Sequence, residues 1–155
     1  MFGTNGGGHK SYGAGGMSGI LNMNENMSVE FENLSRLKSS IIKAYKEGKY
    51  CDLTIKSRDG VALRAHKLLL ASQSKYFSSR LESLEPDCQE LTVPEVGGEA
   101  LRLVIDYIYT QKLRPGSVTK QNAKDILAAG EVFRNEDIKE EAAIFMAKNL
   151  TRRML

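Results

Sequence analysis

The sequence predicts an α+β domain: a small β-sheet with an early β-hairpin, capped by a cluster of short α-helices. Two observations favour this class. Residues 51–65 alternate apolar and polar side chains around a tight turn, which is the pattern of strands. After residue 66, apolar residues recur mainly at spacings of three and four, which is the pattern of helices. Strands that come early and helices that come late are typical of a sheet covered by helices.

Length and composition allow one folded core. The chain has 155 residues, of which 41% are hydrophobic and 26% charged, which is ordinary globular composition. We expect a Gly-rich flexible tail over residues 1–27, a folded domain over residues 28–150 and a short C-terminal end over residues 151–155.

Glycine dominates the start of the chain. Eight of the fourteen glycines precede residue 20, so this segment has too little apolar surface to order itself. It includes Gly6-Gly7-Gly8-His9-Lys10-Ser11, which superficially matches a phosphate-binding loop. That motif needs a glycine directly before the lysine and a strand before the loop. Because His9 intervenes, we expect no nucleotide site.

A helix is predicted from Ser28 to Gly48, with glutamates in its first turn and glycine after its last. Its apolar side chains recur at helical spacing and are Phe31, Leu34, Leu37, Ile41 and Tyr45. The following elements supply a core without this helix, so we expect it at the edge of the domain. Its apolar face then needs a second surface, and spacing alone allows either its own domain or a second chain.

A β-hairpin is predicted next. Leu53 and Ile55 alternate with polar residues, and Val61, Leu63 and Ala65 repeat the alternation on the return. Residues 57–60 separate the two runs and end in Asp-Gly, for which we expect a tight primed turn with positive φ at both residues.

The remaining elements are short. Residues 66–71 form an apolar run for which we expect a buried helix, and a helix over residues 75–85 ends at Pro86. A strand over residues 91–93 and a helix over residues 98–111 follow. Thr119 and Asn135 are expected to start the last two helices.

Several functional classes are disfavoured. The net charge of +3 is too small to imply nucleic-acid binding, and no run reaches the ~18 apolar residues of a membrane span. The start lacks the apolar middle of a signal peptide, so we expect the cytosol or the nucleus. Cys51 and Cys88 lack metal-ligand spacing and are expected to be free thiols.

An enzyme is not expected. His66, Ser72, Ser74 and Asp52 could make a hydrolase triad on paper, but the Gly-x-Ser-x-Gly elbow is missing. A helix-terminal or core histidine is the better interpretation of His66. The carboxylates over residues 82–90 fit a solvated loop rather than an acid/base pair, because no apolar pocket is evident. We expect no cofactor and no metal.

Six segments, taken in order, resemble the BTB (POZ) domain family. The first three are Asp52-Leu53-Thr54-Ile55, then residues 65–72, then Ser74 with Tyr76-Phe77. They are followed by Leu91-Thr92-Val93, Ile105-Asp106-Tyr107-Ile108-Tyr109-Thr110 and Asp125-Ile126-Leu127-Ala128-Ala129-Gly130. The resemblance covers roughly residues 31–150.

The resemblance implies a protein-interaction module that forms a homodimer. In the family the helix corresponding to residues 28–48 meets its copy, which implies Phe31, Leu34, Leu37 and Ile41 as the interface. It also implies a charged pair near the dimer groove, Asp52 and Lys67. Many members carry arginine where this chain has Lys67, so a bidentate contact is not implied.

The resemblance further implies two uses of the module: in adaptors that bring substrates to cullin-based ubiquitin ligases, and in zinc-finger transcription regulators. Residues 47–52 look closer to the adaptor branch, for which Phe77, Leu81 and Tyr109 would form the cullin surface. Adaptors commonly have a hydrophobic-x-Glu motif after the Tyr-Phe pair; here Leu81 fits but Ser83 replaces glutamate. Adaptors also tend to continue into a paired-helix extension, near whose expected start this chain stops. Zinc-finger Cys/His spacing is absent from the 155 residues. A free-standing BTB protein that heterodimerises with longer relatives is a third alternative.

Overall fold

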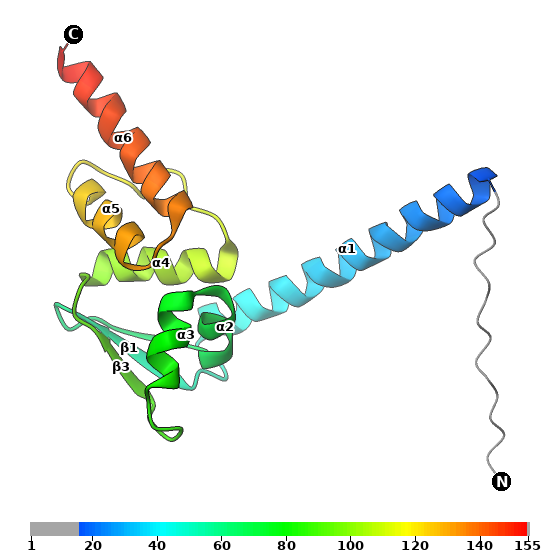
Figure 1. Ribbon diagram of the computed structural model, residues 1–155, viewed down its shortest axis with the longest axis horizontal. Coiled ribbons are helices and arrows are strands. Elements are labelled where there is room, and N and C mark those ends of the chain that lie inside the picture. The colour runs from blue at the N-terminus through cyan, green and yellow to red at the C-terminus, as the bar shows by residue number, and fades with distance from the viewer. Residues whose placement is uncertain (1–15, 155) are drawn as a thin grey trace. The chain divides into compact units, whose positions relative to one another are not determined.

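The computed structural model describes the backbone of residues 16–154 and the side chains of residues 24–150. Its described part contains three strands and six helices (Figure 1). They follow the order α1 (Gly16–Glu47), β1 (Leu53–Ser57), β2 (Ala62–Ala65), α2 (Lys67–Gln73), α3 (Lys75–Glu82), β3 (Glu90–Val93), α4 (Gly98–Thr110), α5 (Ala123–Val132) and α6 (Glu136–Met154). The chain divides into two units, residues 1–40 and residues 41–155, and each is described by itself. None of the described helices is both long enough and apolar enough to cross a membrane.

The first unit contains most of α1. This helix begins at Gly16, twelve residues before the predicted start at Ser28, so part of the segment expected to be a Gly-rich tail is helical. After Gly19 the residues Ile20, Leu21 and Met23 are compatible with a helix, and α1 also includes Gly16 and Gly19. Residues 1–15, where the other tail predictions lie, are outside the described residues.

The second unit is built on a mixed sheet with the order β2-β1-β3. β1 pairs antiparallel with β2, and Ile55 faces Leu63. β1 also pairs in parallel with β3, where Ile55 faces Leu91. The predicted hairpin and the predicted α+β class are confirmed, since the sheet is small and helices cover it.

The hairpin turn differs from the predicted one. Gly60 has φ +85° but Asp59 does not adopt a positive φ, and the N–H of Gly60 donates to the carbonyl of Ser57 at 3.1 Å. This is the three-residue loop in which a type I turn precedes a left-handed glycine. Asp59 stays on the ordinary side of φ because its carboxylate accepts hydrogen bonds from the Ser57 hydroxyl and from the N–H of Gly98 (2.8 Å). Tertiary contact therefore selects the turn type.

Capping residues explain several helix boundaries. The Ser74 hydroxyl accepts from the N–H of Phe77 at 3.4 Å, and Asn135 Oδ1 accepts from the N–H of Ile138 at 3.1 Å. Asn135 thus starts α6 as predicted. Thr119 does not start α5: it exchanges hydrogen bonds with Asn122, and Asn122 precedes the helix.

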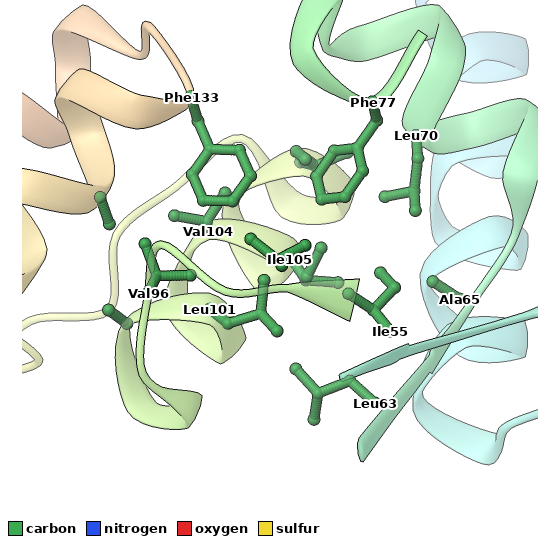
Figure 2. Close-up of a cluster of buried hydrophobic side chains, with 14 of the residues drawn as sticks. Ile55, Leu63, Ala65, Leu70, Phe77, Val96, Leu101, Val104, Ile105 and Phe133 are labelled. Carbon is green, nitrogen blue, oxygen red and sulfur yellow. The ribbon is translucent and has the colours of Figure 1, made fainter. Parts of the chain in front are cut away.

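The core lies between the sheet and the helices (Figure 2). α4 lies between the sheet with α2 and α3 on one side and α5 with α6 on the other (Figure 1). Phe77 of α3 is fully buried and its ring stacks on Phe133 at a centroid distance of 5.3 Å. α4 fits close to the hairpin because Gly98 has no side chain: a Cβ there would lie 2.3 Å from Val61 Cγ2. Gly98 is therefore needed for the contact that Asp59 also stabilises.

The Asp59 contact predicts a pH dependence. The hydrogen bond from Ser57 holds the pKa of Asp59 below its ordinary value, so its contribution to stability is present above about pH 4 and is lost as the pH falls through the lowered folded pKa. We expect Asp59→Asn to be less stable than the parent at pH 7, with the difference narrowing towards pH 3. Urea denaturation at both pH values measures this, and a difference that stays constant across the range would contradict it.

Candidate interaction surfaces

The exposed face of α1 is the first candidate surface. Phe31, Leu34 and Leu37 are 72%, 65% and 59% exposed. Ile41 differs, because it is half-buried against the core of the second unit. Of the four residues predicted for a dimer interface, three are thus available for a second surface and the fourth packs largely within its own chain.

Tyr45 fixes the end of α1 within the second unit. Its ring stacks on Tyr109 of α4 with centroids 4.0 Å apart and planes 8° from parallel. Its O–H donates to Asp106 Oδ1 at 2.5 Å. Burial, with the Asp106 hydrogen bond second, raises the pKa of Tyr45 above its ordinary value, so it remains a neutral donor.

His66 connects Tyr109 to Lys49 in the turn that follows α1. The backbone N–H of His66 donates to Tyr109 Oη at 2.8 Å, and Nδ1 lies 2.6 Å from that oxygen. Nε2 lies 2.7 Å from the carbonyl of Lys49. A carbonyl only accepts, so Nε2 carries the proton and Nδ1 accepts from the Tyr109 O–H. Burial raises the pKa of Tyr109 to about 12, so that proton is retained at neutral pH.

The two serines considered for a hydrolase triad have partners other than His66. The hydroxyl of Ser72 donates to the carbonyl of Leu69, and that of Ser74 caps α3. His66 itself precedes α2 as its N-terminal flanking residue, in agreement with a helix-terminal role.

Asp52 and Lys67 meet through the backbone rather than as an ion pair. Asp52 Oδ1 accepts from the N–H of Lys67 at 2.7 Å, which satisfies the first free N–H of α2. The Lys67 ammonium points elsewhere and donates to the carbonyls of Cys88 (2.6 Å) and Pro86 (3.4 Å). Asp52 is exposed and Lys67 is half-buried. The expectation of a direct charge pair is therefore corrected: the helix start attracts the carboxylate and a nearby turn attracts the ammonium.

The predicted cullin surface also needs correction. Phe77 is fully buried and Tyr109 is 4% exposed, so neither side chain can contact a partner directly. Both face inward because the core needs aromatic volume between α3, α4 and the end of α1. Leu81 is half-buried at the last turn of α3 and is the member of the three that reaches the surface.

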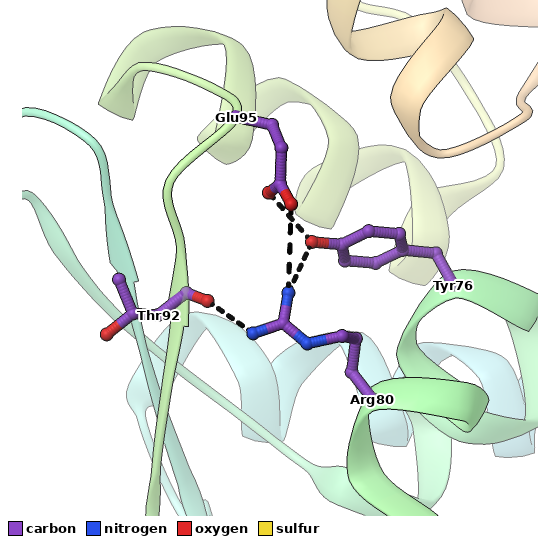
Figure 3. Close-up of polar contacts among 4 residues, drawn as sticks. All are labelled: Tyr76, Arg80, Thr92 and Glu95. Carbon is purple, nitrogen blue, oxygen red and sulfur yellow. Dashed lines mark hydrogen bonds and ion pairs between the residues drawn. The ribbon is translucent and has the colours of Figure 1, made fainter. Parts of the chain in front are cut away.

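Arg80, next to Leu81, joins α3 to the edge strand β3 (Figure 3). Its guanidinium donates to Tyr76 Oη (2.7 Å) and to the carbonyl of Thr92 (2.8 Å), and it lies 4.0 Å from Glu95. Tyr76 donates to Glu95 at 2.9 Å, and burial raises the pKa of Tyr76 to about 12. This network holds α3, and with it Leu81, against the sheet.

Side chains also occupy the outer edge of β3. The carbonyl of Gln89 accepts from β1, so the carbonyls of Glu90 and Thr92 point away from the sheet. The thiol of Cys88 donates to the carbonyl of Glu90 at 3.2 Å, and Arg80 donates to the carbonyl of Thr92. Two outward carbonyls of this edge therefore already have donors.

The sequence did not predict the exposure of two apolar or aromatic residues, Leu68 and Tyr50. Leu68 is 76% exposed although its apolar run predicted burial, because the short α2 turns only Leu70 fully inward. Tyr50 is 86% exposed with φ +62°, which is unusual for a bulky residue. The Leu-Leu-Leu run gives no sign of which leucine faces outward, and no sequence pattern marks the left-handed tyrosine.

An open cleft of about 880 Å³ lies between the segment after α4 and helix α6. Leu113, Val118 and Phe145 contribute apolar side chains, while Arg114 and Glu141 represent charges of both signs. Charge therefore selects no ligand class for this cleft.

Comparison with known proteins identifies a matching family. A family model described as BTB/POZ domain matches residues 41–150. Human Kelch-like protein 2 is 32% identical over 102 residues, which is 64% of this chain and 16% of the relative. Bovine Kelch-like protein 3 is 29% identical over 102 residues, 64% of this chain and 17% of the relative. The chain thus matches only a small part of these longer relatives.

Solved structures show the same fold. The BTB domain of zebrafish PATZ1 has a TM-score of 0.62 and 19% identity, covering 76% of this chain and 93% of that one. The BTB domain of human gigaxonin has a TM-score of 0.60 and 20% identity, covering 74% and 91%.

The Asp52 contact makes a stability prediction. Removing the acceptor in Asp52→Ala should cost about 1 kcal/mol, as for loss of a helix N-cap, and not the about 3–5 kcal/mol of a broken buried ion pair. Asp52→Asn keeps an oxygen acceptor and should cost less than Asp52→Ala. Chemical denaturation at one protein concentration separates the cases, and a loss above about 3 kcal/mol in Asp52→Ala would restore the buried-pair interpretation.

Proposed function

The chain belongs to the BTB/POZ domain family, whose members are protein-interaction modules rather than enzymes, and we propose that it dimerises through α1 and acts as a substrate adaptor of a cullin-based ubiquitin ligase. Its predicted partners are a second copy, a cullin scaffold and other BTB proteins. Its action is proposed in the cytosol or the nucleus.

The observation that carries the dimer is the exposure of Phe31, Leu34 and Leu37. Single exposed apolar residues are common, but three large ones at helical spacing form a patch of the kind that marks protein interfaces. Complete burial of such a side chain contributes about 1.5–3 kcal/mol. A second copy offers an identical patch, and the self-complementary contact closes with two-fold symmetry.

Support for the adaptor role comes from the end of α3. Leu81 is half-buried there, and Ser83, which terminates the helix, is exposed. An apolar anchor beside an open polar position is the arrangement that a hot-spot contact uses. Because Ser83 stands where the resemblance implies glutamate, cullin binding by this chain is proposed to be weak.

The proposed dimer predicts the molar mass of the protein in solution. The parent should run as a dimer in light scattering coupled to gel filtration at tens of micromolar. Leu37→Asp should give a monomeric mass, because it places a charge in an apolar interface. Leu37 is exposed within its own chain, so this variant should still fold and show the parent's far-ultraviolet circular dichroism.

Ser39→Asp is the matched control, because Ser39 is exposed on the same helix and helical spacing places it away from the apolar face. It should leave the mass unchanged. A monomeric parent would refute the dimer, as would a dimeric Leu37→Asp.

The adaptor role predicts a gain of binding. Ser83→Glu should bind the amino-terminal region of a cullin scaffold more tightly than the parent by about 1–2 kcal/mol, if the new carboxylate accepts a hydrogen bond. Isothermal titration calorimetry measures this. Leu81→Asp should abolish binding, provided that its melting temperature confirms a folded chain.

Ser79→Glu controls for added charge, because Ser79 is exposed on α3 one turn earlier, and a gain at Ser83 that exceeds the gain at Ser79 assigns the effect to position 83. If neither the parent nor Ser83→Glu binds at high micromolar concentration, the adaptor role is wrong. The dimerisation domain of a transcription regulator, or a free-standing BTB protein that heterodimerises with longer relatives, would then replace it.

A further inference from the structure

The connection between α3 and β3, residues Ser83–Gln89, depends on a side chain from elsewhere in the fold. Lys67, at the first position of α2, donates from Nζ to the carbonyl of Cys88 at 2.6 Å and to that of Pro86 at 3.4 Å. A hydrogen bond from an ionised donor is stronger than one between neutral groups. The ammonium therefore binds the backbone of a segment that is more than fifteen residues further along the chain.

The connection has few bonds of its own. The N–H of Cys88 donates to the carbonyl of Glu85 at 2.9 Å, which closes a turn with Pro86 at its second position. Leu84 packs against the core, and the carbonyl of Gln89 accepts from Thr54. These contacts fix the two ends of the segment and leave its middle exposed.

Among the described residues, Lys67 is the one side chain outside the connection and its two flanking elements that hydrogen-bonds to it. Lys67 is itself held in place, because its backbone N–H donates to Asp52, the residue just before β1. The start of α2, the start of β1 and the middle of the connection thus meet at one residue.

We infer that Lys67 is a positioning residue that holds the Glu85–Cys88 turn in place and so shapes the surface beside Leu81. The geometric part stands on the contacts of the ammonium alone. The consequence for partner binding rests on the proposed adaptor function, because it takes Leu81 as the anchor of that surface. A mobile turn would have to be ordered on binding, which lowers the affinity.

Cys88 provides a direct probe of the turn. It is half-buried and the chain has one other cysteine, Cys51. In a Cys51→Ser background, Lys67→Met removes the ammonium but keeps most of the apolar stem. Reaction of Cys88 with a chromogenic disulfide reagent should then be about tenfold faster than in the parent background.

Controls separate the local effect from general loosening. Lys67→Arg keeps a charged donor and should restore a rate close to the parent's. Lys75→Met removes an exposed lysine from the start of α3 and should not change the rate. In a Cys88→Ser background, where Cys51 is the remaining thiol, Lys67→Met should not change the rate at which Cys51 reacts.

An unchanged Cys88 rate in Lys67→Met overturns the inference, and so does an equal acceleration at Cys51, which would mean that the whole domain loosens. The functional half is tested in the Ser83→Glu chain, where Lys67→Met should weaken cullin binding about tenfold and Lys75→Met should not. If Lys67→Met speeds the reaction of Cys88 but leaves the cullin affinity of the Ser83→Glu chain unchanged, the functional half is overturned. If Ser83→Glu itself does not bind, the adaptor role fails while the thiol rates still decide the role of Lys67.

Discussion

The parallel pairing of β1 with β3 is the constraint on which the rest of the domain depends. Two parallel strands cannot be joined by a tight turn, so the chain must cross from one end of the sheet to the other before β3 can begin. The crossover is residues 58–89, and it contains β2, α2, α3 and the connection that follows α3. Both Lys67 and Leu81 lie in it. The surface proposed for a partner is thus part of the crossover that the parallel pairing requires.

Local patterns predicted most of the fold, because hairpins, helix starts and apolar spacing are encoded within a few residues. The hairpin and the start of α6 at Asn135 are examples. The candidate site was harder. Phe77 and Tyr109 read as surface residues by resemblance, but both face inward, which only the packing of α3 and α4 determines. Lys67 finds its acceptors about twenty residues away, and backbone carbonyls have no sequence signature. Contacts of this kind cannot be read from spacing.

The aromatic network at the end of α1 shows how a helix can have two roles along its length. Tyr45 stacks on Tyr109, which in turn exchanges hydrogen bonds with His66. His66 also donates to the carbonyl of Lys49, so the turn after the helix is held as well. The raised pKa values of Tyr45 and Tyr109 keep both hydroxyls neutral and able to donate. The last turns of α1 are part of the domain core, which leaves the apolar residues before Ile41 free for another surface.

The occupied carbonyls of β3 have a consequence for how the sheet can grow. An unprotected edge strand is a template on which another chain can add a strand, which is a common route to aggregation. Arg80 and Cys88 give two carbonyls of this edge a donor from within the chain, and a newcomer would have to displace both. Two of the outward carbonyls of β3 are therefore already occupied, which makes the addition of a foreign strand along this edge less favourable. For the proposed dimer through α1, such an edge would keep association at the helix and away from the strands.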